Sequence, residues 1–235
     1  MVFLIAEIGV NWDGDFDLLN EMMKNAKKVG FNAVKFQAFL PEMVKAHPES
    51  SRLVKSSITK ENIKQIDKLA KSVGIEWFAT PMYKEAVHLL EPFVNRFKIR
   101  EFDGREIVNG NTTEIFEEIK KTEKEIIISS QISPKNTKFY NDPKIKWLYC
   151  VPKYPCPIEK INFENLNDFN GFSNHTTHFL APLMAVILGS KIIEIHITSD
   201  KTKKFVDNNV SFNYNEAKNL ISLIHLSEKV NKKND

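Results

Sequence analysis

Short apolar runs alternate along the chain with longer segments in which apolar residues recur every three or four positions. The first run, residues 2–10, is apolar at nearly every position, which is typical of a parallel strand covered on both faces. After a turn, the apolar residues between Asp17 and Lys28 follow the 3.6-residue period of an amphipathic helix. Gly30 then provides a typical helix stop. The N-terminal part of the chain therefore predicts one strand–helix unit.

This alternation continues to the end of the chain. Strands are predicted at residues 2–10, 33–39, 75–80, 96–100, 125–130, 145–151, 171–176 and 192–198. Helices are predicted at residues 17–28, 60–72, 113–121, about 163–169, 179–188 and 213–230, and a further helix follows the third strand and ends at residue 90. Helical crossovers between successive parallel strands are right-handed. Eight strands with seven or eight helices predict an α/β fold, the (β/α)8 TIM barrel.

Two segments depart from this regular pattern. Residues 132–144 are rich in Pro, Asn and Lys and lack a helical period, so the fifth helix is expected to be shortened or missing. Residues 41–59 form a long polar loop after the second strand. A loop of that length in a compact domain usually has a function.

Length and charge limit the classes of protein to consider. A chain of 235 residues with 42% hydrophobic content suits one barrel as well as two small domains. No internal repeat or linker divides it, so we expect a single domain over residues 1–235. The net charge of +3 comes from 33 basic and 30 acidic residues mixed along the chain. This mixture indicates a solvated surface and argues against a nucleic-acid partner.

The cysteines and the N-terminus favour a cytoplasmic protein. Only Cys150 and Cys156 occur, and Cys150 falls within an apolar run, which argues against a disulfide framework and a thiolate zinc site. The first ten residues lack a basic leader and indicate a buried strand, not a signal peptide. No apolar run approaches the length of a membrane span, so we expect no membrane partner.

Polar residues at the carboxyl ends of the predicted strands mark the expected site, because TIM barrels build their active sites there. In chain order these residues are Glu7, Lys35, Gln37, Thr80, Lys98, Asp103, Ser129, Ser130, Tyr154, Ser173, His175, Glu194 and His196. We expect them to converge on one mouth of the barrel.

Two histidines stand out in this set. His175 and His196 follow adjacent parallel strands and should therefore lie side by side. A single strand-borne histidine is more often a hydrogen-bonded structural residue than a metal ligand. Two at matching strand ends favour a metal site, in which two imidazoles, waters and an acid hold an octahedral divalent ion.

Two lysines within strands favour an anionic ligand. Burying the ammonium group of Lys35 or Lys98 is costly unless an anion or carboxylate meets it. Either lysine alone could bury its methylene chain and extend its ammonium group to solvent. Both together, with several hydroxyl groups, favour a phosphate or carboxylate ligand. Combined with the histidines, they suggest a phosphorylated or carboxylated substrate that meets a carbonyl polarised by metal.

Seven motifs together resemble one known family. They are Ala6–Asn11 (AEIGVN), Val34–Gln37 (VKFQ), Ala79–Pro81 (ATP), Phe97–Ile99 (FKI), Tyr154–Pro157 (YPCP), Ser173–Thr176 (SNHT) and Glu194–Thr198 (EIHIT). In this order, over nearly the whole chain, they resemble the sialic acid synthase (N-acetylneuraminate synthase) family. The resemblance implies a transferase that condenses phosphoenolpyruvate with the aldehyde of an N-acylated sugar, such as N-acetylmannosamine, to give a nonulosonic acid. It also implies Mn²⁺ or Mg²⁺ as cofactor.

The resemblance assigns roles by position. The metal ligands are His175 and His196. The phosphoenolpyruvate-binding set is Lys35, Thr80, Lys98, Ser129 and Ser173. The expected catalytic residues are Glu7 and Gln37, which line the same mouth, and Asp103, an acid that handles protons. The sugar contacts are Tyr154 and Asp207. In the implied mechanism the metal polarises the aldehyde, the enol C3 attacks it, water adds at C2 and phosphate leaves.

The chain departs from the family pattern in three places. After Lys98 the family usually has a small residue and a phosphate-holding serine, but this chain has Arg100 and Glu101. Where an asparagine commonly precedes the Tyr-Pro turn, it has Pro152. We also expect no counterpart of the family's C-terminal antifreeze-like domain, which in the family reaches across a dimer and supplies an arginine to the sugar. We therefore expect poor phosphate handling, unless Glu101 turns outward and pairs with Arg100 or Arg105, and either a homodimer or a separate partner chain.

Two other functions stay open. Glu101 and Pro152 also suit a divergent metal-binding barrel that acts on another sugar or oxo-acid by aldol-type or hydrolytic chemistry. A non-catalytic barrel that binds a sugar acid or serves a partner subunit is the third alternative. Phosphate release from phosphoenolpyruvate with N-acyl sugars distinguishes the first function from both.

Overall fold

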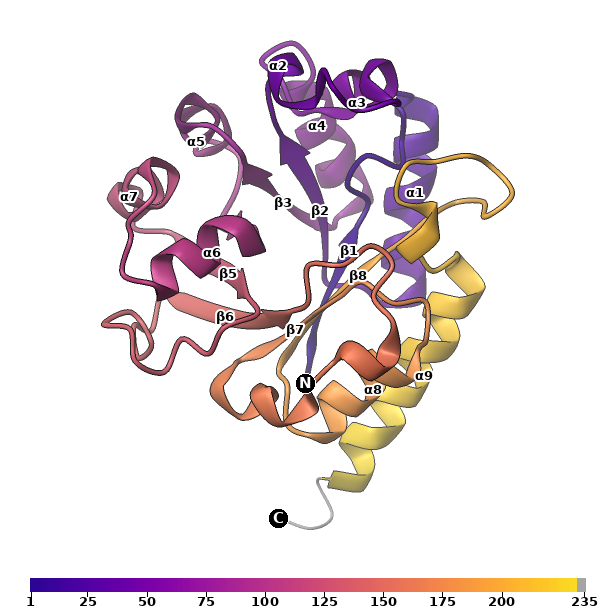
Figure 1. Cartoon of the computed structure of the whole chain (residues 1–235). Coiled ribbons are helices and arrows are strands. Elements are labelled where there is room, and N and C mark those ends of the chain that lie inside the picture. The colour runs from indigo at the N-terminus through magenta and orange to yellow at the C-terminus, as the bar shows by residue number, and fades with distance from the viewer. Residues whose placement is uncertain (232–235) are drawn as a thin grey trace.

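A closed barrel of eight parallel strands forms the centre of the molecule (Figure 1). The computed structural model describes residues 1–231. The strands are β1 (Phe3–Glu7), β2 (Ala33–Ala38), β3 (Glu76–Pro81), β4 (Arg96–Ile99), β5 (Glu125–Ser130), β6 (Ile145–Cys150), β7 (Gly171–Asn174) and β8 (Ile192–His196). Each strand pairs with the next, and β8 closes on β1 with Glu7 opposite His196. The expected TIM barrel is confirmed.

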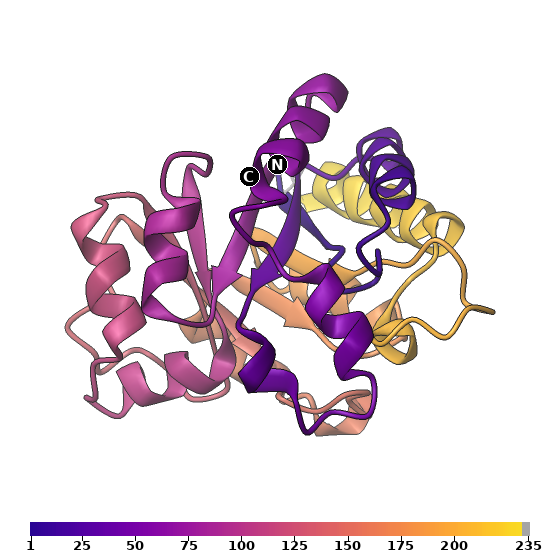
Figure 2. The ribbon, with the colours of Figure 1, turned by 90° about the horizontal axis from the view of Figure 1, so that it is seen from above.

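Helices surround the strands as an outer layer (Figure 2). The longer ones are α1 (Phe16–Val29), α4 (Ile63–Val73), α5 (Lys84–Leu90), α6 (Glu101–Val108), α7 (Glu114–Lys121), α8 (Leu180–Ile187) and α9 (Tyr214–Asn231). Local sequence sets their ends: the Asp15 side chain accepts hydrogen bonds from the first turn of α1, and Gly30 ends that helix in a left-handed conformation. None of the described helices is both long and apolar enough to cross a membrane.

The loops of the barrel differ in part from the expectation. Within the described chain, no helix connects β5 to β6, which confirms the missing fifth helix. The long segment 41–59 was expected to be a loop, but it contains two short helices, α2 (Pro41–Val44) and α3 (Ser50–Ser56). Helix α6 was not expected, because four charged residues and a glycine hide the apolar period in its eight residues. The helix expected near 163–169 is a 3₁₀ helix, η2 (Phe163–Asp168).

Gly104 lets α6 pack directly on β5. A Cβ atom at this position would lie 2.0 Å from the Ser129 carbonyl oxygen and 2.8 Å from the Ile128 side chain. We expect Gly104→Ala to lower the free energy of unfolding by about 3 kcal/mol, since the backbone of α6 must move away from the strand. Urea denaturation measures this loss.

Gly110 offers the matched control, because a Cβ there meets no atom within 4 Å and adds only the strain of a positive φ. We expect Gly110→Ala to cost about 1 kcal/mol. Equal losses for the two variants would contradict the close packing of α6 on β5.

Candidate active site

The carboxyl ends of the strands line a cavity of about 600 Å³. The residues expected to bind phosphoenolpyruvate all line this cavity, namely Lys35, Thr80, Lys98, Ser129 and Ser173. The remaining expected residues in the cavity wall are Glu7, Gln37, Tyr154, His175, His196 and Asp207. The structure therefore brings together eleven of the twelve residues to which the resemblance assigns a role. Glu194 joins them, whereas Ser130, also expected at the mouth, does not line the cavity.

Among the residues with an assigned role, Asp103 does not line this cavity. Its buried carboxylate accepts a hydrogen bond from Arg100 Nε at 2.7 Å and faces a neighbouring surface hollow. Asp103 lies two positions into α6, and residues two apart on a helix point to different faces. Glu101, at the start of α6, points into the cavity instead.

Two buried lysines and two buried glutamates form an ion-pair network at the inner end of the cavity. Lys35 Nζ lies 2.9 Å from Glu7 and 3.8 Å from Glu194. Lys98 Nζ lies 3.3 Å from Glu194 and donates a hydrogen bond to Ser129 Oγ at 2.8 Å. Ser173 donates to Glu194 at 2.8 Å. Glu194 thus contacts both lysines and Ser173 of β7. The sequence placed Glu194 among the strand-end residues but did not predict these contacts.

The two lysines differ in their electrostatic balance. Burial lowers the pKa of Lys35, but Glu194 and Glu7 outweigh this effect and leave the pKa above its ordinary value. Burial lowers the pKa of Lys98, and Glu194 only partly opposes it. Burial raises the pKa of Glu194, but Lys35 and Lys98 outweigh it and lower the pKa to about 2. The carboxylates stabilise the charged form of Lys98 less than that of Lys35. A bound anion should therefore stabilise the Lys98 ammonium group more than that of Lys35.

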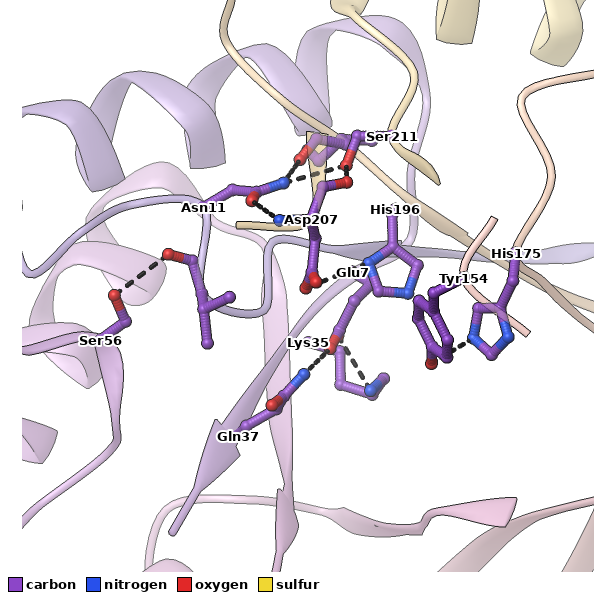
Figure 3. A network of polar contacts seen from close by, with 12 residues as sticks. Glu7, Asn11, Lys35, Gln37, Ser56, Tyr154, His175, His196, Asp207 and Ser211 are labelled. Carbon is purple, nitrogen blue, oxygen red and sulfur yellow. Dashed lines mark hydrogen bonds and ion pairs between the residues drawn. The ribbon is translucent and has the colours of Figure 1, made fainter. Parts of the chain in front are cut away.

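Gly9 follows β1 and allows the side chains of Glu7, Gln37 and Asp207 to approach the backbone there. Figure 3 shows these three side chains. The φ of Gly9 is +53°, and a Cβ there would lie 3.1 Å from Glu7 Oε1 and 3.4 Å from both Gln37 Nε2 and Asp207 Oδ2. Gln37 Nε2 donates to Glu7 Oε1 at 2.9 Å. This contact fixes the Glu7 carboxylate between an amide and Lys35, with its other oxygen facing the ammonium group.

His175 and His196 lie side by side as expected, with ring centroids 5.5 Å apart. His175 Nδ1 lies 3.0 Å from the Val151 carbonyl oxygen, which can only accept, so Nδ1 carries the proton. The Tyr154 hydroxyl then donates to His175 Nε2 at 2.6 Å (Figure 3). Burial lowers the pKa of His175 to about 3, so the ring is neutral and Nε2 has a lone pair available.

Asp207 faces the second histidine. Its Oδ2 atom lies 3.6 Å from His196 Nδ1, and no described residue donates to or accepts from that nitrogen within hydrogen-bond distance. Burial lowers the pKa of His196, but Asp207 outweighs it and raises the pKa above its ordinary value. The loop that carries Asp207 is held by Asn11, which accepts from the Asp207 N–H at 3.0 Å and donates to Ile197 and Ser211 (Figure 3).

The two imidazoles fit a divalent ion that takes most of its ligands from oxygen. The described residues contain no group of three or more His, Cys, Asp and Glu side chains at metal-ligand spacing. Two imidazoles, each of which can bind a metal in its neutral form, would occupy two coordination positions of the ion. The remaining positions would be left to water or substrate oxygens, which Mn²⁺ and Mg²⁺ prefer as ligands. A closed structural zinc site needs four protein ligands, and this donor set does not supply them.

The β4–α6 side of the cavity carries residues that have no counterpart in the expected set. Arg100, Glu101, Phe102 and Arg105 all line it, and Pro152, which follows β6, lines the same cavity. The Glu101 side chain is 7% exposed and lies 4.0 Å from Arg105 Nε. Glu101 is therefore inside the cavity and not turned outward, although Arg105 is its nearest cation.

The outer wall is built by the segment after β2. Val44, His47 and Leu53 line the cavity, so the long segment 41–59 forms part of its wall. Arg52 of α3 contacts Asp13 and the Lys204 carbonyl and lies over the Phe205 ring at 5.9 Å. Three loops of the mouth are thus tied together. Cys150 also lines the cavity, and burial raises its pKa to about 12, so its thiol stays protonated.

Comparisons with known proteins agree with this architecture. The model of the NeuB family matches residues 22–235. An uncharacterised protein of Methanocaldococcus jannaschii is 32% identical, over 97% of this chain and 71% of its own length. Pseudaminic acid synthase of Campylobacter jejuni is 29% identical, over 97% of this chain and 74% of its own length. The crystal structure of a sialic acid synthetase from Leptospira borgpetersenii has the same fold, with a TM-score of 0.83, 24% identity and coverage of 97% of this chain and 84% of that one.

Proposed function

The chain belongs to the NeuB family, and we propose that it is a nonulosonic acid synthase that joins phosphoenolpyruvate to the open-chain aldehyde of an N-acylated sugar. The observation that carries the proposal is the convergence of Lys35 and Lys98 with His175 and His196 in one cavity. Its relative pseudaminic acid synthase supports a sugar-acid product. The reaction consumes one water and releases one phosphate.

The inner end of the cavity would bind the anionic substrate. Lys35 and Lys98 offer two ammonium groups, and Thr80, Ser129 and Ser173 offer hydroxyl donors around them. Because Glu7 and Glu194 already neutralise the lysines, the site is nearly balanced in charge before the substrate enters. The substrate must therefore compete with these carboxylates for the ammonium protons, which favours an anion that contacts both lysines at once.

His175 Nε2 and His196 would hold Mn²⁺ or Mg²⁺. When bound, the ion supplies Lewis-acid polarisation of the aldehyde oxygen. The Tyr154 hydroxyl donates a hydrogen bond to the lone pair of His175 Nε2. If Nε2 held a metal ion, the Tyr154 hydroxyl would lose this acceptor and could donate to a sugar oxygen. Glu7 Oε2 lies 2.9 Å from Lys35 Nζ, and the Glu7 carboxylate would accept a proton from the water that adds at C2. Gln37 keeps that carboxylate in place.

The test is phosphate release from phosphoenolpyruvate with a panel of N-acyl sugars and Mn²⁺, together with mass spectrometry of the product. Release that depends on both substrates is expected. No release with any sugar, in a protein that still binds Mn²⁺, would overturn the proposal. Aldol-type chemistry on pyruvate is the second candidate, because Glu101 places a negative charge in the cavity, and the same panel with pyruvate tests it.

We expect His196→Ala to weaken Mn²⁺ binding about tenfold or more, because one of two protein ligands is lost. Calorimetric titration of the folded protein measures this without any substrate. The control is His225→Ala, an exposed histidine on α9, which should bind Mn²⁺ as the parent does. Undiminished affinity in His196→Ala would remove His196 from the metal site.

A further inference from the structure

Asn11 is the last residue of the Ala6–Asn11 motif and has no role in the proposed reaction. Its side chain is fully buried. Its Nδ2 donates to the Ile197 carbonyl oxygen at 3.0 Å and to Ser211 Oγ at 2.9 Å, and its Oδ1 accepts from the Asp207 N–H at 3.0 Å. The Ile197 carbonyl can only accept and the Asp207 N–H can only donate, so these partners fix the orientation of the amide. Both N–H donors of the amide are therefore in use.

The three partners of Asn11 belong to one loop, which leaves the barrel after β8. Ile197 and Phe212 pair as an isolated bridge, so the segment between them leaves and returns at the same place. The outer part of the loop, residues 201–204, is exposed. Asn11 contacts the start of the loop, its return at Ser211 and the peptide of Asp207 between them (Figure 3). A residue that follows β1 thus anchors the loop that follows β8.

Both polar groups of the Asp207 backbone depend on this anchor. The Asp207 N–H donates to Asn11, and the Asp207 carbonyl accepts from Ser211 Oγ at 2.7 Å. Because Ser211 Oγ itself accepts from Asn11, removing the Asn11 amide loosens both contacts. The anchored backbone places Asp207 Oδ2 3.6 Å from His196 Nδ1. That nitrogen is buried and has no hydrogen-bond partner among the described residues, so Asp207 is the acceptor placed to orient the ring.

We propose that Asn11 is a positioning residue for the metal-binding histidine His196 and that it acts through Asp207. A histidine that binds a metal through one ring nitrogen usually donates its other N–H to a carboxylate or carbonyl, which fixes the orientation of the ring. Asp207 supplies this carboxylate only while Asn11 and Ser211 hold its backbone. The inference rests on the proposed function, because that function places the divalent ion on His196.

A double-mutant cycle on Mn²⁺ affinity tests this chain of contacts without any substrate. Calorimetric titration of the folded chain compares the parent, Asn11→Ala, Asp207→Ala and the double variant. Each single change is expected to weaken Mn²⁺ binding about tenfold. The double variant should bind only as weakly as Asp207→Ala, because Asn11 acts through that carboxylate. A merely structural role of Asn11 would lower the stability of the chain and leave the Mn²⁺ affinity of the folded protein unchanged.

Asn32→Ala is the matched control. Asn32 Oδ1 accepts from the Leu4 N–H at 2.7 Å, near the amino end of β1 and therefore at the end of the barrel opposite the cavity. This change removes the same kind of contact between an asparagine side chain and the backbone, and it should keep the Mn²⁺ affinity of the parent. Ser211→Ala replaces Asn11→Ala if the latter does not fold. It removes one of the two contacts on the Asp207 backbone and should weaken Mn²⁺ binding about threefold.

Three results overturn the inference. They are undiminished Mn²⁺ affinity in both Asn11→Ala and Ser211→Ala, a double variant that binds about tenfold more weakly than Asp207→Ala, and an equal loss in Asn32→Ala. The proposed function fails in a different way. A parent that binds no Mn²⁺ overturns the metal site itself and the inference with it, and the absence of phosphate release overturns the proposed reaction.

Discussion

Replacing Glu194 by alanine is expected to lower the free energy of unfolding by about 3–5 kcal/mol, the usual cost of removing one partner of a buried ion pair. Lys35 keeps Glu7 at 2.9 Å in this variant, but Lys98 loses its only carboxylate within ion-pair distance among the described residues. Ser173 loses its hydrogen-bond acceptor as well. Most of the loss should therefore arise from a Lys98 ammonium group left buried without a counter-charge.

The pH dependence of this loss follows from the pKa of Glu194. Lys35 and Lys98 outweigh burial and lower that pKa from 4.5 to about 2. A lowered carboxylate pKa stabilises the folded state at pH values above 4.5, and this stabilisation disappears as the pH falls from 4.5 toward 2. The parent and Glu194→Ala should therefore differ most at neutral pH and much less at pH 3.

Urea denaturation at pH 7 and pH 3 measures both effects. Glu117→Ala is the control, because Glu117 pairs with Lys120 on the surface of α7 at 3.4 Å and should contribute less than about 1 kcal/mol. A Glu194→Ala loss as small as that of the control, or one that stays constant between the two pH values, would contradict the role of Glu194 as the common partner of both lysines.

The barrel was predictable from sequence because its strands bury both faces and its helices bury one. Apolar runs such as 125–130 and the 3.6-residue period of 17–28 are local signals that need no knowledge of the partner. Helix α6 lacked such a signal, since its buried residues include Glu101 and Asp103. Their burial depends on the cavity and on Arg100, which are tertiary features. The same holds for α3, which buries only Leu53 and Ser56, and for α2, which buries no residue.

The sequence predicted which residues line the site, but not which of their atoms are in contact. Residues two apart in a strand share a face, so Lys35 with Gln37 and Glu194 with His196 could be placed in the mouth together. The contact between Lys98 and Glu194 joins residues 96 positions apart and arises only when the barrel closes. Whether Glu101 or Asp103 faces the substrate depends on where α6 begins, which the sequence did not signal.

Changing Glu101 to serine and Pro152 to asparagine together is expected to tighten phosphoenolpyruvate binding about a hundredfold. Glu101 lies inside the cavity, and a like charge near a bound phosphate costs a few kcal/mol, or about two decades in affinity. Pro152 lines the same cavity and has no N–H, and its ring offers no polar contact, whereas asparagine offers an amide. Both changes act on the same anionic ligand.

Calorimetric titration with phosphoenolpyruvate in the absence of sugar measures this gain. Glu101→Gln separates the causes, because it removes the charge and keeps the side-chain length. If repulsion dominates, Glu101→Gln alone recovers most of the gain, and the advantage shrinks as salt screens the charges. A parent that already binds phosphoenolpyruvate as tightly as the double variant would contradict this account.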